Sequence, residues 1–281
     1  MPVELGAHTL PYRAYPLERA LAGVAGAGYR YVGIWNDHAG APLVPPAASD
    51  AQILELRRQI EAAGLQPRMA FRFPAEDPDP TAVMRRSVHV CGALGIPYLL
   101  SSGPSPYSGR GFEARKRDML FRREAEAYFA TLREVAPLAQ RAGITIVVKP
   151  HMGVTGTGAD LADIVELIDH PGLRVCYDAG NIAYYEGLTP EEDVKDCARY
   201  VRAVCIKDHR GGRANADFPT PGEGDVDHAA IFRTLLDAGF SGPALVERID
   251  GQADAEAMDA ALAQARVSLT QALETAAAAR T

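Results

Sequence analysis

Short runs of β-branched and aromatic residues alternate along the chain with longer segments rich in Ala, Leu, Glu and Arg. The apolar runs predict strands at residues 3–8, 30–35, 66–72, 96–101, 144–149, 173–178, 201–207 and 243–248. The longer segments predict helices at residues 17–27, 51–63, 80–94, 120–142, 159–169, 190–199, 227–238 and 254–279. Such alternation is typical of βα units built around a parallel sheet.

A glycine recurs where a predicted helix ends and the next strand begins. These junction glycines are Gly28, Gly64, Gly95, Gly143, Gly172 and Gly239. Glycine adopts at little cost the left-handed conformation that ends a helix. The repeat predicts a (β/α)8 TIM barrel of the α/β class, forming a single domain over residues 1–281. An open doubly wound sheet is the alternative, but the segment from the end of the first strand onward reads LGAHTLPYRAYP and has no GxGxxG, so no nucleotide cofactor is expected.

Charge and composition narrow the classes of partner. The 281 residues include 29 Lys and Arg against 36 Asp and Glu, a net charge of −7, which argues against nucleic-acid binding. No apolar stretch approaches the roughly 18 residues of a membrane span, and the N-terminus does not resemble a secretion signal. The four cysteines have no paired spacing, as expected of free thiols in a reducing compartment. We expect a cytoplasmic protein with no membrane or nucleic-acid partner.

Polar residues follow the predicted strands, at the end where a barrel gathers its active site. They are His8; Trp35 and Asn36; Arg68 and Arg72; Ser101 and Ser102; Lys149 and His151; Asp178 and Asn181; Lys207, Asp208 and His209; and Glu247 and Arg248. Two long loops, 103–117 and 209–226, are expected on the same rim.

Four of these side chains follow strongly apolar runs: Lys149, Asp178, Lys207 and Glu247. A buried unpaired charge costs several kcal/mol, so these groups have to be paired or bound. One interpretation is a structural ion-pair network that closes the barrel. The other is a site in which carboxylates and imidazoles surround a polar substrate or a divalent cation, and in which burial and cationic neighbours lower the pKa of a lysine.

Other residues around the rim suit substrate binding. Arg68, Arg72 and Arg110 match a phosphate or carboxylate, although surface charges would look the same. Trp35, the one tryptophan, would stack on a sugar face or pack in the core.

Four segments are similar to motifs of a known family. IVVKPHMG (146–153) is similar to HxHMGT at strand five of 2-keto-myo-inositol dehydratases, and VCYDAGN (175–181) to DxGH or DTxH. VCIKDH (204–209) is similar to HxKD, and residues 220–247 to a PGxGxVD loop followed by a helix and a strand ending in Glu. On these motifs nearly the whole chain resembles the xylose isomerase-like barrels, a superfamily of sugar isomerases and epimerases that also includes endonuclease IV.

The resemblance implies a divalent metal bound at the ends of strands five to eight by Glu, Asp, His and Glu. The matching positions here are Lys149, Asp178, Cys205 and Glu247, and Asn181 replaces a substrate-binding His. Because an ammonium repels a cation, two outcomes stay open.

In the first outcome, Mn²⁺, Mg²⁺ or Co²⁺ binds Asp178 and Glu247, which are hard ligands, together with His151 and with His209 or water. In the second, Lys149 supplies the positive charge and the site holds no metal.

Three functions are consistent with these residues. The first is an isomerase or epimerase of a sugar, sugar phosphate or keto-polyol. A base (Glu247, Asp178 or His151) removes the proton next to a carbonyl, and Lys149, Lys207 or a metal stabilises the enediolate. The second is a lyase that takes the same first step, after which the substrate loses water or, if it is a 3-keto-glycoside, its aglycone. The third is a non-catalytic carbohydrate-binding barrel.

The expected roles are as follows. The catalytic residues are Lys149, His151, Lys207 and Glu247, and the substrate contacts are His8, Trp35, Arg72, Asn181, Asp208 and His209. The partner is a small carbohydrate. An endonuclease would need a His-rich zinc set and a basic groove, which this acidic chain with seven histidines lacks. The sequence leaves the oligomeric state open, although rim loops of this type often meet a partner subunit.

Overall fold

The structure, a computed structural model, describes residues 3–103 and 119–279. In these residues eight parallel strands close into a barrel. They are β1 (Glu4–His8), β2 (Tyr31–Ile34), β5 (Gln66–Ala70), β6 (Tyr98–Ser101), β7 (Thr145–Val148), β8 (Leu173–Tyr177), β9 (Val201–Ile206) and β10 (Pro243–Val246). β1 pairs with both β2 and β10, which closes the ring. The predicted (β/α)8 barrel is therefore confirmed.

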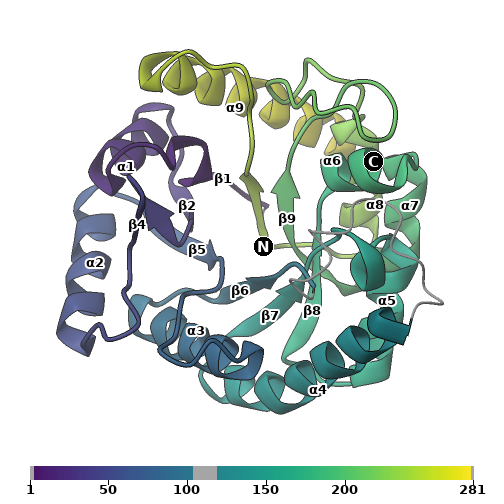
Figure 1. The fold of residues 1–281 in the computed structure, drawn as a ribbon. Helices are drawn as coiled ribbons and strands as arrows, with labels where there is room; N and C mark the ends of the chain where they lie inside the picture. The colour runs from purple at the N-terminus through teal and green to yellow at the C-terminus, as the bar shows by residue number, and fades with distance from the viewer. Residues whose placement is uncertain (1–2, 104–118, 280–281) are drawn as a thin grey trace.

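Helices surround this ring of strands, as the view along the barrel in Figure 1 shows. The main ones are α1 (Leu17–Gly26), α2 (Asp50–Ala62), α3 (Pro80–Leu94), α4 (Met119–Arg141), α5 (Gly158–Ile168), α7 (Pro190–Cys197), α8 (His228–Asp237) and α9 (Ala255–Ala278). Side-chain caps fix several starts: Ser49 and Gln52 form a reciprocal capping box at α2, and Asp227 accepts from the Ala230 N–H at α8. Each predicted helix is present.

Apolar side chains form two separate clusters. The larger one lies between the strands and the surrounding helices. The smaller one fills the inside of the barrel with Met69, Leu100, Val147, Cys176, Ala203, Cys205 and Leu245, all essentially unexposed. The barrel interior is thus a packed core, and only its ends offer space for a ligand.

The glycine junctions behave as predicted at five of six positions. Gly28, Gly64, Gly95, Gly143 and Gly239 all have positive φ, between 72° and 84°. Gly172 does not, because Asp169 (φ 46°) already ends α5 in the left-handed conformation. A Cβ on Gly172 would lie 2.5 Å from the Ala136 carbonyl oxygen, so glycine is needed there for close contact with α4.

Several short elements were not predicted. They are the hairpin β3 (Asp37–His38) and β4 (Ala41–Pro42), the turn α6 (Ala179–Asn181) with a π-helical turn at Ile182–Glu186, and 3-10 turns at Leu10–Tyr12, Gly153–Thr155 and Ala198–Tyr200. Segments this short carry no readable hydrophobic period. Residues 209–226 form a loop as predicted, whereas the other predicted loop from residue 104 on, and Arg110 with it, lies outside the described residues.

Two further expectations concern cysteines and membranes. All four cysteines are buried free thiols. Among the described residues, no helix is long and apolar enough to cross a membrane.

Candidate active site

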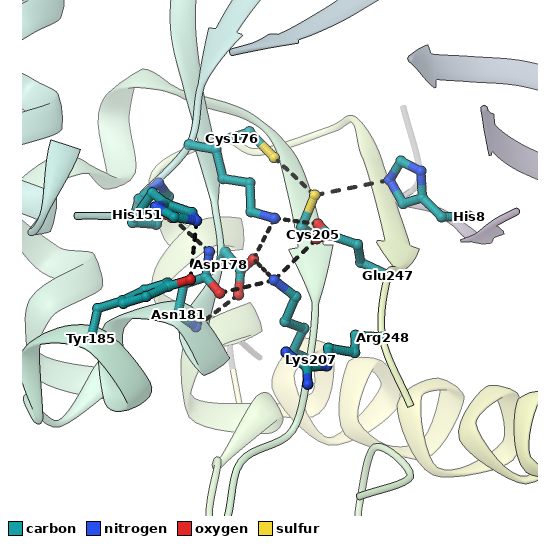
Figure 2. Close-up of polar contacts among 12 residues, drawn as sticks. His8, His151, Cys176, Asp178, Asn181, Tyr185, Cys205, Lys207, Glu247 and Arg248 are labelled. Atoms are coloured by element: carbon teal, nitrogen blue, oxygen red, sulfur yellow. Dashed lines mark hydrogen bonds and ion pairs between the residues drawn. The ribbon is translucent and has the colours of Figure 1, made fainter. Parts of the chain in front are cut away.

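Four buried charged side chains meet where β7, β8, β9 and β10 end (Figure 2). Nζ of Lys149 lies 2.9 Å from Oδ2 of Asp178 and also forms an ion pair with Glu247. Nζ of Lys207 lies 3.0 Å from the same Asp178 oxygen and 3.0 Å from Oε1 of Glu247. Each ammonium therefore contacts both carboxylates, and no member is more than 5% exposed. We refer to these four residues as the ion-pair cluster.

The strands fix the ion-pair cluster through their backbone. The Lys149 N–H donates to the Ser101 carbonyl at 2.8 Å, and the Glu247 N–H to the Ile206 carbonyl at 2.9 Å, so the parallel ladder continues one residue beyond β7 and β10. This sets the first residue after each apolar run over the barrel interior. The sequence signal of a charge directly after an apolar strand is thereby explained.

Close packing around a turn completes the cluster. The Asp178 carboxylate caps the α6 turn by accepting from the Asn181 N–H at 3.0 Å. A Cβ on Gly180 would lie 2.6 Å from Cβ of Lys207, so glycine lets this turn approach β9. Oδ1 of Asn181 accepts from Nζ of Lys207 at 2.8 Å, and its amide donates to the Pro150 carbonyl.

Mutual attraction keeps Lys149 and Glu247 ionised. Burial alone lowers the pKa of Lys149, but the Asp178 and Glu247 carboxylates outweigh it and hold that pKa well above its usual value. Burial alone raises the pKa of Glu247, but Lys149 and Lys207 hold it well below its usual value. The expectation of a lowered lysine pKa is therefore wrong for Lys149, since its neighbours are chiefly anionic.

His151 and Tyr185 lie beside the cluster. Nε2 of His151 and the Tyr185 hydroxyl are 3.0 Å apart, and their ring centroids are 4.4 Å apart. Burial, reinforced by the two ammoniums, lowers the pKa of His151 to about 4. Burial raises the pKa of Tyr185 to about 12. At neutral pH the pair is thus a neutral imidazole and a protonated phenol.

A cavity of about 680 Å³ opens above the cluster. This volume lies within the roughly 300–1,000 Å³ common for small-molecule sites. Of the residues expected to act on or bind a substrate, the structure brings seven to the cavity wall: Trp35, Arg72, Lys149, His151, Asn181, Lys207 and Glu247. The lining residues that sequence reasoning missed include Arg13, Tyr185 and Asp250, which lie in loops and turns where position cannot be inferred from a strand pattern.

Comparison with known proteins identifies the family. The sequence pattern of the xylose isomerase-like TIM barrel family matches residues 21–269. The chain belongs to this family. Inosose dehydratase of Clostridium perfringens is 29% identical over 148 residues, which cover 47% of this chain and 49% of that protein. The matched region thus spans about half the length of this relative.

Solved structures agree on the fold over the whole chain. A xylose isomerase domain protein from Planctomyces limnophilus has a TM-score of 0.75 at 19% identity, covering 98% of both chains. D-psicose 3-epimerase from Clostridium cellulolyticum H10, solved with D-tagatose, has a TM-score of 0.75 at 17% identity, covering 96% of this chain and 99% of its own. A xylose isomerase-like barrel protein from Mycobacterium smegmatis, solved in complex with magnesium, has a TM-score of 0.73 at 18% identity, covering 97% of both chains.

The ion-pair cluster does not fit a divalent cation. The facing carboxylate oxygens of Asp178 and Glu247 already accept from two ammoniums, which cannot act as ligands. His151, predicted as a third ligand, does not form with these two carboxylates a group close enough to share an ion.

In the described part of the chain, the one group of three ligating residues close enough to hold a metal is His8, Cys205 and Glu247, whose ligand atoms lie within 4.8 Å of one another. Burial, together with the neighbouring Cys176 thiol, holds the pKa of Cys205 well above its usual value, so the thiol stays protonated. Glu247 is also shared with the two lysines. This group fits a cation poorly as well.

His8 lies behind the cavity floor, not in its wall. It is fully buried, with Nε2 3.9 Å from Sγ of Cys205. A Cβ on Gly33 would lie 2.1 Å from its ring, so glycine makes room for the imidazole. Burial, with the two lysines of the cluster, lowers the pKa of His8 to about 4 against the pull of Glu247. The predicted substrate contact through His8 is not supported by this position.

Asp208 and His209 organise the 209–226 loop. The Asp208 carboxylate is fully buried and accepts from four backbone N–H groups at 2.8–3.2 Å, those of His209, Gly222, Gly224 and Val226. A Cβ on Gly224 would lie 2.2 Å from that carboxylate, which explains why the second glycine of the PGEGDVD segment is needed. Nε2 of His209 lies 2.7 Å from the Asn215 carbonyl in the same loop. Both residues therefore shape the rim. Neither lines the cavity, so their predicted substrate contacts are not supported.

Arg68, which the sequence suggested as a substrate-binding residue of the rim, lies elsewhere in the structure. Its guanidinium pairs with Glu4, the first residue of β1, at 2.9 Å and lies over the ring of Tyr31. This is the end of the barrel opposite the cavity, because Arg68 lies within β5 and not at its end.

Proposed function

We propose that the protein is a carbohydrate isomerase or epimerase that removes a proton next to a carbonyl group. The observation that carries this proposal is a pair of buried ammoniums, Lys149 and Lys207, at the floor of a cavity that also presents a carboxylate, Glu247. Positive charge aimed at the oxygen where negative charge develops usually contributes most to the rate of such reactions. Membership of a family whose solved barrels include sugar epimerases supports a carbohydrate substrate.

In the proposed reaction Glu247 is the base. Of the two carboxylates of the ion-pair cluster, Glu247 lines the cavity, whereas Asp178 is fully buried and does not. Glu247 takes the proton from the carbon next to the carbonyl, and the electron pair of that C–H bond moves to form an enediolate. Because this proton neutralises Glu247, the N–H groups of Lys149 and Lys207 that contact Glu247 are released, and the enediolate oxygen accepts hydrogen bonds from them.

The second proton transfer decides the product. Return of the proton to the former carbonyl carbon, together with transfer of the hydroxyl proton from one enediolate oxygen to the other, gives an isomer. Delivery from the opposite face gives an epimer, and the Tyr185 hydroxyl, hydrogen-bonded to His151, is the acid that we assign to this transfer. Because burial raises its pKa to about 12, the phenol is protonated at neutral pH and so carries the proton for this transfer.

We also propose that the ammoniums of Lys149 and Lys207 supply the positive charge that a divalent cation would otherwise supply at this site. Lys149 stands at the position where the family resemblance implies a metal-ligating carboxylate, and its Nζ contacts both remaining carboxylates. The reaction described above accordingly uses no metal.

A lyase is the second candidate, favoured by the similarity to inosose dehydratase. The same enediolate would expel a hydroxyl or an alkoxide from the β-carbon instead of taking back a proton.

Product analysis separates the candidates. The protein is incubated with D-fructose, D-tagatose, D-ribulose, D-ribulose 5-phosphate and 2-keto-myo-inositol, and the products are identified by NMR. New ketose or aldose isomers support the proposal, and a dehydrated product supports the lyase. If no probe reacts although the sugars bind, and binding persists in Glu247→Gln, a non-catalytic barrel becomes the better account.

A further inference from the structure

Nearly every charged side chain in the cavity wall has a partner of opposite charge. The ion-pair cluster balances itself at the floor. Arg248 donates to both carboxylate oxygens of Asp250, at 2.8 and 2.6 Å, and lies over the ring of Phe218. In the described part of the wall, Arg13 and Arg72 are the two charged residues with neither a carboxylate partner nor a side-chain hydrogen bond.

The backbone around both arginines is held in place. The Arg72 carbonyl, two residues beyond β5, accepts from the Asn36 side-chain amide at 2.8 Å. The Arg13 carbonyl accepts from the Ala39 N–H at 2.9 Å, which ties the segment before α1 to the β3–β4 hairpin. Arg72 is half-buried, whereas Arg13 is exposed at the rim. Both positions are therefore set by the scaffold, and only the guanidinium groups are left without partners.

This arrangement gives the cavity an excess of positive charge in a chain whose net charge is −7. A concave site lined by one sign of charge concentrates ligands of the opposite sign. A guanidinium also offers a planar set of donors that matches the oxygens of a carboxylate or phosphate. A neutral sugar would leave both cations unpaired.

We infer that Arg72, with Arg13, forms an oxyanion subsite, and that the substrate carries a carboxylate or phosphate group. The carbonyl end lies at the ion-pair cluster and the anionic group lies toward the rim. The inference rests on the proposed function only for the direction in which the carbonyl points, since binding of the anionic group requires no turnover.

Binding of matched probes tests the subsite. Isothermal titration compares D-ribulose 5-phosphate with D-ribulose, and D-glucuronate with D-glucose. We expect the anionic member of at least one pair to bind more tightly by roughly ten- to a hundredfold, the effect of a charge-assisted contact. The preferred pair tells a phosphate from a carboxylate.

Variants locate the effect. Arg72→Ala should remove most of the preference for the anionic member of the pair, and Arg13→Ala should have a smaller effect because Arg13 is exposed. The control is Arg85→Ala, which removes an exposed arginine of α3 that pairs with Glu134. Thermal scans verify that each variant is folded.

Equal binding of both members of each pair overturns the inference, as does an anionic preference that survives the double variant Arg13→Ala/Arg72→Ala. These outcomes differ from failure of the proposed function, which would appear as a retained anionic preference without any proton transfer.

Discussion

Lys149→Glu tests whether the ammonium stands in for a metal. The substitution replaces one of the two cations of the ion-pair cluster with a third carboxylate, next to Asp178 and Glu247. The only ammonium left within the cluster would be that of Lys207. Without metal, the variant should therefore be less stable than the wild-type protein. It should also acquire affinity for a divalent cation.

The magnitude follows from burial of the cluster. Breaking a buried ion pair costs about 3–5 kcal/mol, and Lys149 is 2% exposed with contacts to both carboxylates. For a chain of this size each kcal/mol shifts Tm by roughly 2–4 °C, so a fall of about 10 °C is expected. Mn²⁺ at a hundred times its Kd would return about 2.7 kcal/mol.

The assay is thermal unfolding with and without Mn²⁺ after removal of metals by EDTA, supported by calorimetric titration. Lys149→Met is the matched control, since it removes the same charge without adding a ligand and should be destabilised but not rescued. Stoichiometric Mn²⁺ binding by the wild-type protein, with a Tm increase of several degrees, would show that the ammonium does not replace a metal. Equal responses of the Glu and Met variants would show the same.

Three further predictions concern single groups. Glu247→Gln should lower kcat on an identified substrate by roughly a hundredfold or more with little change in KM, because it removes the base; unchanged kcat would exclude Glu247 as the base. Stability should fall between pH 6.5 and 4, because the pKa values of His8 and His151 are near 4 in the folded protein, so the unfolded chain takes up these protons first. At pH 5 the loss is about 2 kcal/mol for each histidine, measured by urea unfolding; His151→Gln should reduce this slope, and an unchanged slope would contradict the assignment. Asp208→Asn should lower the free energy of unfolding by about 2–3 kcal/mol and speed proteolysis of residues 209–226. The control Asp217→Asn, at an exposed ion pair, should change stability by less than about 1 kcal/mol. Equal effects of the two substitutions would show that the Asp208 contacts are not the cause.

The barrel could be predicted from the sequence because its signals are local. Most strands are short apolar runs, and several helix starts carry a side-chain cap such as Ser49 or Asp227. The hairpin at residues 37–42 and the turns near Asn181 are set by contacts between distant segments. No short-range pattern announces them.

The ion-pair cluster was predictable for a related reason. A charge directly after an apolar strand must lie in the mouth of the barrel, and the closed ring brings four such positions together. The ion-pair interpretation of the sequence also predicted that Lys149 and Lys207 would face Asp178 and Glu247, and all four of these pairs are present. The pKa of Lys149 is raised, and not lowered as expected, because two carboxylates contact its ammonium. Only the fold determines how close these carboxylates lie.

The errors concern residues for which strand position alone was misleading. Asp208 lies two residues beyond β9, but its carboxylate turns toward the loop amides and not the cavity. His8 ends β1, yet it lies beneath the floor because Gly33 on the neighbouring strand leaves space for its ring. In both cases a glycine far along the chain determines the side-chain environment.

Hydrogen exchange at the substrate carbon shows whether the two lysines support proton transfer without a metal. The protein is stripped of metal with EDTA and incubated in D₂O with the ketose panel and with the anionic sugars named above, and deuterium at the carbon next to the carbonyl is followed by NMR. We expect incorporation by the metal-free wild-type protein and its loss in Lys149→Met and Lys207→Met. Incorporation that appears only after Mn²⁺ is added, or that persists in both variants, would contradict the role proposed for the ammoniums.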